Sequence, residues 1–204
     1  MHDTHINGAG AGPPRAANST DAFAVALKEW SLLCDVLAQG RQAILLRKGG
    51  VYESAGEFEL EHRRFPLYPT VIHQNPDMLK PEYAVRVTPA LCEPKKIIIH
   101  SWADVFWITT VPDRVRMDRL NHLHIWNDKL LDMRFNYRPN YPLYLILLDV
   151  HRLVQPVELP MHDDYIGCRS WVNLKEPLAV GASESVHSPA ALGEIQDCIM
   201  RLFA

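Results

Sequence analysis

Ionisable side chains crowd the segment from Arg41 to Gln74, which reads RQAILLRKGGVYESAGEFELEHRRFPLYPTVIHQ. Carboxylates and imidazoles are the groups that bind divalent cations and transfer protons, and Glu61, His62 and His73 are the candidates for that chemistry. They predict a metal-assisted hydrolase with an acidic and histidine site. The metal and any cofactor stay unidentified, because the sequence has no close His-x-x-x-His or His-Glu-x-x-His spacing.

The alternation of a β-strand favours another interpretation of these residues. Side chains two apart in a strand share a face, so His62 would lie on the apolar face of Phe58 and Leu60. Glu59 and Glu61 would then lie on the opposite face. In this alternative the glutamates form a solvated acidic face paired with basic neighbours, and His62 is a hydrogen-bonded core residue.

Basic and aromatic residues near the same segment form a second candidate site, suited to phosphate groups. Lysine and arginine neutralise phosphates, and aromatic rings stack on bases. As alternatives to a binding site, the charged residues form an ordinary surface of mixed charge, and Trp171 anchors the core. The predicted ligand-binding residues are Arg47, Lys48, Arg63, Arg64, Tyr68, Gln74, Ser170 and Trp171.

The restriction-nuclease pattern is poorly matched. That pattern needs Asp/Glu-x-Lys on a strand, and the nearest match is Glu93-Pro94-Lys95. The central proline cannot donate a backbone hydrogen bond in a sheet, so this segment is a poor nuclease strand.

Composition limits the partners and the location. The chain has 204 residues, of which 48% are hydrophobic, so it can bury the core of one compact domain. Its net charge of −3 gives no overall attraction to nucleic acid or anionic lipid, so phosphate binding needs a local patch. The longest apolar run, Leu143 to Leu148, is far shorter than the roughly 20 residues of a membrane helix. We therefore predict a protein that does not enter a membrane, and the four scattered cysteines predict a cytoplasmic location.

The chain is predicted to contain one domain preceded by a leader. Residues 1–19 are rich in glycine, alanine, proline and asparagine and predict a disordered N-terminal leader. Residues 20–204 predict a single domain. Its four cysteines are widely scattered, which is typical of reduced thiols and not of a disulfide scaffold.

Hydrophobic periodicity predicts both helices and strands. The first helix is expected to begin at Thr20 and to end at Gly40. A central helical insertion begins at Asp113 and again at Asn127, and a closing helix begins at Ser188-Pro189. The predicted strands are Ala43–Leu46, Glu57–Phe65, Leu67–Ile72, Ile97–Ile99, Val105–Val111 and Leu143–Val150.

These elements predict an α+β fold. A small curled sheet, mixed or antiparallel, would be packed by the N- and C-terminal amphipathic helices and by the central helical insertion. The nearest analogy is a half-barrel of the PUA type, which is found in nucleic-acid-binding proteins. This is an analogy of fold, and a fold does not specify a function.

Short motifs follow one another in a distinctive order between Glu29 and Leu174. They are Glu29-Trp30, Leu45 to Gly50, Phe58, Glu61-His62, Leu67 to Thr70, His73-Gln74, His124 to Trp126, Arg134-Phe135 and Gly167 to Val172. In this order they resemble an uncharacterised bacterial family, the domain of unknown function 1802. The resemblance implies no established activity. Some members are linked with restriction-type endonuclease domains, which implies a role around foreign DNA and an endonuclease as a partner.

The leading hypothesis is a nucleic-acid-binding accessory protein associated with DNA restriction or defence. One alternative is the metal-assisted hydrolase, and another is a structural protein-interaction module whose apolar helix faces recruit a partner. The hypotheses differ in whether the polar candidates meet in one cleft. The residues that decide this are Arg47, Lys48, Glu61, His62, Tyr68 and His73.

Overall fold

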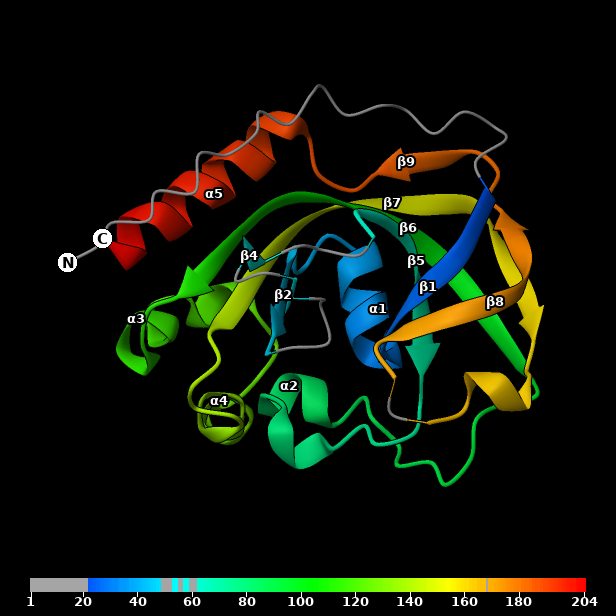
Figure 1. Cartoon of the computed structure of the whole chain (residues 1–204), viewed down its shortest axis with the longest axis horizontal. Helices are drawn as coiled ribbons and strands as arrows, with labels where there is room; N and C mark the ends of the chain where they lie inside the picture. The colour runs from blue at the N-terminus through cyan, green and yellow to red at the C-terminus, as the bar shows by residue number, and fades with distance from the viewer. Residues whose placement is uncertain (1–21, 49–52, 55–56, 59–61, 168) are drawn as a thin grey trace.

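The computed structural model describes residues 22–48, 53–54, 57–58, 62–167 and 169–204 (Figure 1). The strands are β1 (Ala22–Trp30), β2 (Ile44–Arg47), β3 (Glu53–Ser54), β4 (Glu57–Phe58), β5 (Arg64–Thr70), β6 (Lys96–Val111), β7 (Leu143–Pro160), β8 (Trp171–Ala179) and β9 (Ser183–Ser185). The helices are α1 (Ser31–Ala38), α2 (Pro81–Ala84), α3 (Arg114–Asp118), α4 (Asp128–Asn136) and α5 (Pro189–Phe203). Three short 3-10 turns are η1 (Pro76–Met78), η2 (Asn121–Leu123) and η3 (Asp163–Tyr165).

Seven strands form one mixed sheet. Six of them follow the order β2-β7-β6-β5-β1-β8, and β9 pairs with β7. β1 and β5 run parallel, whereas the other neighbouring strands in this sheet are antiparallel. β3 and β4 form a separate pair. The predicted α+β class with a mixed sheet is confirmed.

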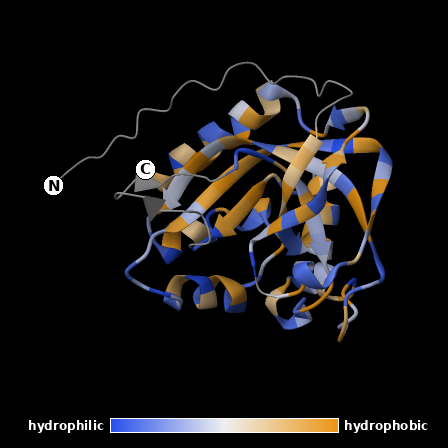
Figure 2. Cartoon of the chain, turned by 45° about the vertical axis from the view of Figure 1, so that its right-hand side comes forward, coloured by the Kyte–Doolittle hydropathy of each residue, from blue (hydrophilic) through white to orange (hydrophobic). Residues whose placement is uncertain are grey.

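The sheet is curled, because strands far apart in its order contribute to one apolar cluster. Phe23 of β1, Trp102 of β6, Leu153 of β7 and Leu174 of β8 belong to the same buried cluster. A second cluster on the other face of the strands includes the apolar side chains of α1. In Figure 2 the apolar colour concentrates on the strands at the centre of the molecule. Both faces of the central strands are therefore covered.

The described chain begins with a strand, so the helix predicted from Thr20 is wrong over its first half. β1 runs to Trp30, and α1 covers only Ser31–Ala38. Ala26 and Leu27 are both buried, in different clusters, because β1 lies between β5 and β8 and packs on both faces. The apolar spacing of this segment fits both a helix and a strand covered on two faces. Gly40 ends the helix with φ of 67°, as predicted.

The other predicted helix starts are confirmed. The side chains of Asp113, Asn127 and Ser188 each accept a backbone N–H bond at the start of α3, α4 and α5. The strands predicted at Ile97–Ile99 and Val105–Val111 are parts of one long strand, β6, whose register shifts twice against β7. These irregularities bend the strand and support the curl of the sheet.

Several predictions fall on residues that the structure does not describe. They include the leader at 1–19, the helix start at Thr20 and the acidic pair Glu59 and Glu61. Within the described ranges, no helix has the length and apolar character needed to cross a membrane.

Candidate functional site

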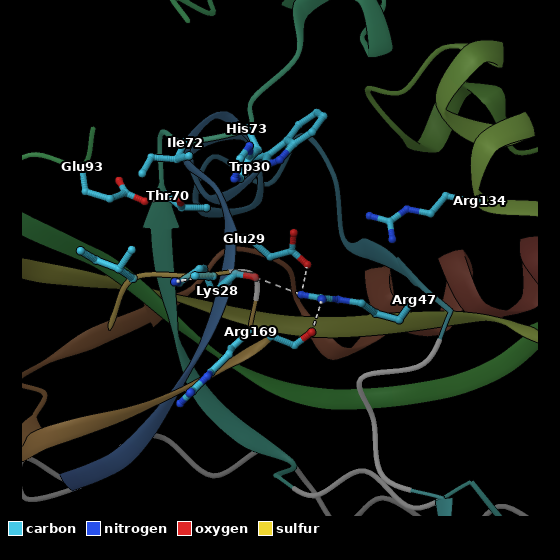
Figure 3. A pocket seen from close by; sticks show the side chains of 13 residues that line it. Lys28, Glu29, Trp30, Arg47, Thr70, Ile72, His73, Glu93, Arg134 and Arg169 are labelled. Atoms are coloured by element: carbon cyan, nitrogen blue, oxygen red, sulfur yellow. Dashed lines mark hydrogen bonds and ion pairs between the residues drawn. The ribbon is translucent and has the colours of Figure 1, made fainter. Parts of the chain in front are cut away.

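A cavity of about 390 Å³ lies where six segments of the chain meet (Figure 3). This volume is within the range of small-molecule sites. The carboxyl ends of the parallel strands β1 and β5 contribute neighbouring walls. The cavity is completed by β2, α4, the segment before β8 and Glu93 from the segment before β6. The lining residues are Lys28, Glu29, Trp30, Arg47, Thr70, Ile72, His73, Glu93, Arg134, Ile166, Gly167, Arg169 and Ser170.

Arg47 is fixed at one side of this cavity. Its Nη2 forms an ion pair with Glu29 and donates a hydrogen bond to the Lys28 carbonyl oxygen at 3.1 Å. Its Nη1 donates to Ser170 Oγ at 3.1 Å. The side chains of Arg47 and Glu29 are only 12% and 14% exposed. Glu29 therefore serves to position Arg47 in a largely buried ion pair.

Arg134 of α4 lies in the same cavity without such a partner. It makes no hydrogen bond or ion pair with the described residues, and its Nε–H is buried with no acceptor. Figure 3 shows its side chain pointing from α4 towards the pair of Glu29 and Arg47. A small adjoining cavity places Arg134 beside apolar residues that include Leu46 and Trp126.

The electrostatic state of Arg134 follows from these surroundings. Burial lowers the pKa of Arg134, the charge of Arg47 lowers it further, and the carboxylate of Glu29 acts in the opposite direction. An arginine pKa begins so high that the guanidinium keeps its proton at neutral pH. A cation with no ion-pair partner among the described residues therefore lines the cavity.

Hydrogen bonds fix the other walls. Lys28 Nζ donates to the carbonyl oxygens of Tyr165 and Gly167, the latter at 3.0 Å. Glu93 accepts a bond from Thr70 Oγ1 and another, at 3.1 Å, from the backbone N–H of Val71. Both carboxylates of the cavity are thus bonded to the protein itself.

The lining carries an excess of positive charge. Its cations are Lys28, Arg47, Arg134 and Arg169, and its carboxylates are Glu29 and Glu93, which gives +2 with His73 neutral. The whole chain carries −3, so this is a local positive patch on an acidic protein. A cavity with this balance is suited to a small anion.

Three of the predicted site residues meet in the cavity. They are Arg47, His73 and Ser170. His73 has φ of 66° in the turn after β5, a conformation that is uncommon for a residue with a side chain. Ser170 holds Arg47 through its hydroxyl group. A common cleft is therefore present for part of the predicted set.

Other predicted ligand-binding residues have structural partners elsewhere. Lys48 is buried and donates its Nζ to the Phe135 carbonyl oxygen at 2.5 Å. Burial lowers the pKa of Lys48. Gln74 accepts the backbone N–H of Leu32 at 2.9 Å and so satisfies a free donor at the start of α1.

Arg63, Arg64 and Tyr68 lie on β5 or just before it. Arg63 is exposed. Arg64 pairs with Asp104 at 3.0 Å, and its guanidinium lies 4.7 Å from the centre of the Trp102 ring. Tyr68 is fully buried, and burial raises the pKa of its hydroxyl group. These three residues do not line the cavity.

The two histidines of the predicted catalytic set lie at opposite ends of β5. His62 precedes the strand, and its ring meets the edge of Trp171 at 5.0 Å between centres. His73 follows the strand, whose seven residues span roughly 20 Å. One ion therefore cannot bind both imidazoles.

Glu61, the third member of that set, lies outside the described residues, so the catalytic role stays a prediction. The predicted ligand-binding residue Trp171 packs against Phe65, at 5.2 Å between ring centres. Among the residues that the structure describes, no group of three or more histidine, cysteine or acidic side chains could hold a metal ion.

The prediction of ligand-binding residues missed several lining residues, among them Lys28, Glu29, Glu93 and Arg134. A usable signal was present for two of them, because Glu29 and Arg134 belong to the motifs that carry the family resemblance. Thr70 was in those motifs as well. Lys28 and Glu93 had no comparable signal.

Comparisons with known proteins agree with those motifs. A family model described as "Domain of unknown function (DUF1802)" matches residues 26–197. No curated protein matches the sequence. Among solved structures, ASCH from Zymomonas mobilis has 13% identity and a TM-score of 0.43, covering 74% of this chain and 87% of that chain. A mutant form of the same Zymomonas mobilis protein has 12% identity and a TM-score of 0.41, with 74% and 89% covered.

Proposed function

We propose that this chain, which belongs to the DUF1802 family, binds nucleic acid by accepting a phosphate group between Arg47 and Arg134. The observation that carries this proposal is Arg134, a largely buried guanidinium without an anionic partner among the described residues. An unpaired buried charge is costly, and a bound phosphate would neutralise it. Arginine also presents paired N–H donors that match phosphate oxygens.

The aromatic wall of the cavity favours a nucleic acid over a simple inorganic anion. Trp30 lines the same cavity as the two arginines. Stacking of a base on an aromatic ring contributes about 1–3 kcal/mol and does not depend strongly on sequence. Bases are available for such stacking in single strands, so we take single-stranded nucleic acid as the ligand.

The finer parts of the hypothesis belong to the same proposal. The shared apolar cluster of β1, β6, β7 and β8 supports a half-barrel of the PUA type. The family resemblance supports an accessory role in restriction or defence, with an endonuclease as partner. The scattered cysteines support a cytoplasmic location.

Fluorescence anisotropy with labelled single strands tests the proposal. Ribo- and deoxyribo-oligonucleotides of about 12 nucleotides cover the usual site size of such proteins. We expect binding that weakens between about 50 and 200 mM salt, because phosphate binding releases counterions. Arg134→Met should weaken binding about 10- to 100-fold, since it removes a charged contact to phosphate.

Arg201→Met is the matched control. Arg201 is exposed on α5 and does not line the cavity, so its replacement should leave the affinity unchanged. Melting temperatures of both variants check that the fold is intact. Equal binding by the wild-type protein and a folded Arg134→Met variant would contradict the proposal.

A further inference from the structure

The charges at the two ends of the cavity are different. Figure 3 shows Arg47 and Arg134 on one side and Glu93 on the other. Glu93 is held by Thr70 and Val71 and keeps its carboxylate against the cavity. An anion is therefore favoured at the arginine end and disfavoured at the Glu93 end.

From this asymmetry we infer that the preferred ligand is a phosphomonoester, the terminal phosphate of a strand or of a nucleotide, and not an internal phosphodiester. This inference rests on the proposed function. A terminal phosphate carries nearly two negative charges at neutral pH, which matches the net charge of +2 in the lining. An internal phosphodiester carries only one.

The free donors at the arginine end also favour a terminal phosphate. A guanidinium has five N–H donors. Arg47 uses its Nη groups on Ser170, Lys28 and Glu29, and its Nε–H has no acceptor among the residues that the structure describes. Arg134 uses none of its donors within the described residues. The three terminal oxygens of a monoester can accept from both arginines, whereas a diester offers only two such oxygens.

The neighbours of an internal phosphate would be poorly placed. In a continuous strand, each phosphate has a charged phosphate on both sides. If one phosphate lay between Arg47 and Arg134, a strand that continued across the cavity would bring another towards Glu93. A strand that ends at the arginines has a neighbouring phosphate on one side only, so no charged phosphate has to lie across the cavity near Glu93.

Four versions of one labelled oligonucleotide test the inference with the full-length protein. They carry a 5′ phosphate, a 3′ phosphate, a 5′ phosphate capped as its methyl diester, or hydroxyl groups at both ends. We expect at least one phosphorylated end to bind about tenfold more tightly than the hydroxyl form. The methyl-capped end should bind like the hydroxyl form, because it has lost one charge and one terminal oxygen.

Arg134 variants connect this preference to the cavity. Arg134→Met should reduce the ratio between phosphorylated and hydroxyl ends to about one, while Arg201→Met should preserve it. Arg134→Lys keeps the charge without the paired donors and should give an intermediate ratio. A competition experiment shows whether the phosphomonoester belongs to a free nucleotide or to a strand end. In it, a nucleoside 5′-monophosphate competes with the labelled strand, and inorganic phosphate is the comparison.

The outcomes distinguish this inference from the proposed function. Equal affinity for all four oligonucleotides, weakened by Arg134→Met, would overturn the inference and leave the proposed function standing. Absence of binding to every strand and to the nucleotide would overturn both. Binding of the nucleoside 5′-monophosphate in a direct calorimetric titration, with no strand bound, would support the phosphomonoester and overturn nucleic-acid binding.

Discussion

Arg134 on helix α4 and Arg114 on the neighbouring helix α3 have opposite surroundings. Arg114 of α3 forms ion pairs with three carboxylates, those of Asp118, Asp128 and Asp132, the latter two at 2.8 Å. Arg134 follows Asp132 by two residues, yet has no ion pair within the described residues. The carboxylates of α4 are thus directed to its exposed side, while its buried side keeps a lone cation.

This difference shows which charges point to function. Asp128 is 87% exposed, and ion pairs with such residues contribute little because water screens them. The environment of Arg134 is the reverse, since it combines burial with the absence of a partner. A costly arrangement of this kind is expected where a ligand supplies the missing charge.

The largest predicted effect concerns His124, a buried basic side chain that avoids this cost by losing its proton. His124 is 4% exposed, and burial, followed by the charge of Lys80, lowers its pKa from 6.5 to about 4. An imidazole can lose its proton, whereas a guanidinium cannot. Between these pKa values the unfolded chain binds a proton that the folded chain does not, so stability falls as pH decreases.

Between pH 7 and pH 4 the contribution of His124 should lower the free energy of unfolding by about 3 kcal/mol. Urea unfolding of the wild-type protein and of His124→Phe from pH 7 to pH 4 measures it. The variant should lose less stability than the wild type over this interval. Identical pH profiles would show that His124 is not kept neutral by burial.

The second prediction compares the stability of the two arginine variants directly. Without ligand, Arg134→Met should raise the free energy of unfolding by about 1 kcal/mol, because it removes an unpaired buried charge. Arg114→Met should lower it by about 1 kcal/mol or less, because its carboxylate partners are exposed. Urea unfolding measures both values. A larger loss of stability in Arg134→Met than in Arg114→Met would reverse the comparison.

The smallest predicted effect concerns Glu29, the carboxylate closest to the proposed phosphate position. Glu29→Gln keeps a hydrogen-bond acceptor for Arg47 but removes a negative charge from the cavity. The affinity for a phosphorylated strand should increase about threefold, because one repulsive interaction is lost. Titration of the variant measures this change. Weaker binding would mean that the charge of Glu29 is needed to orient Arg47.

Local signals predicted part of the fold. Asp113, Asn127 and Ser188 begin helices because their side chains bond to nearby backbone N–H groups, and Gly40 ends a helix because it tolerates a positive φ. Such features depend only on neighbouring residues. The segment at Ala22–Trp30 was assigned wrongly because its strand state depends on pairing with β5 and β8, which are distant in sequence.

The sequence alone indicated Arg47, His73 and Ser170 as candidates, and the family motifs contained Glu29 and Arg134. Only the tertiary structure decided which arginine is neutralised. Arg47 meets Glu29 across 18 residues and Ser170 across 123, whereas Arg134 pairs with no carboxylate in the described part of the chain. Charge pairing depends on distances in space, and these are set by the packing of the whole sheet.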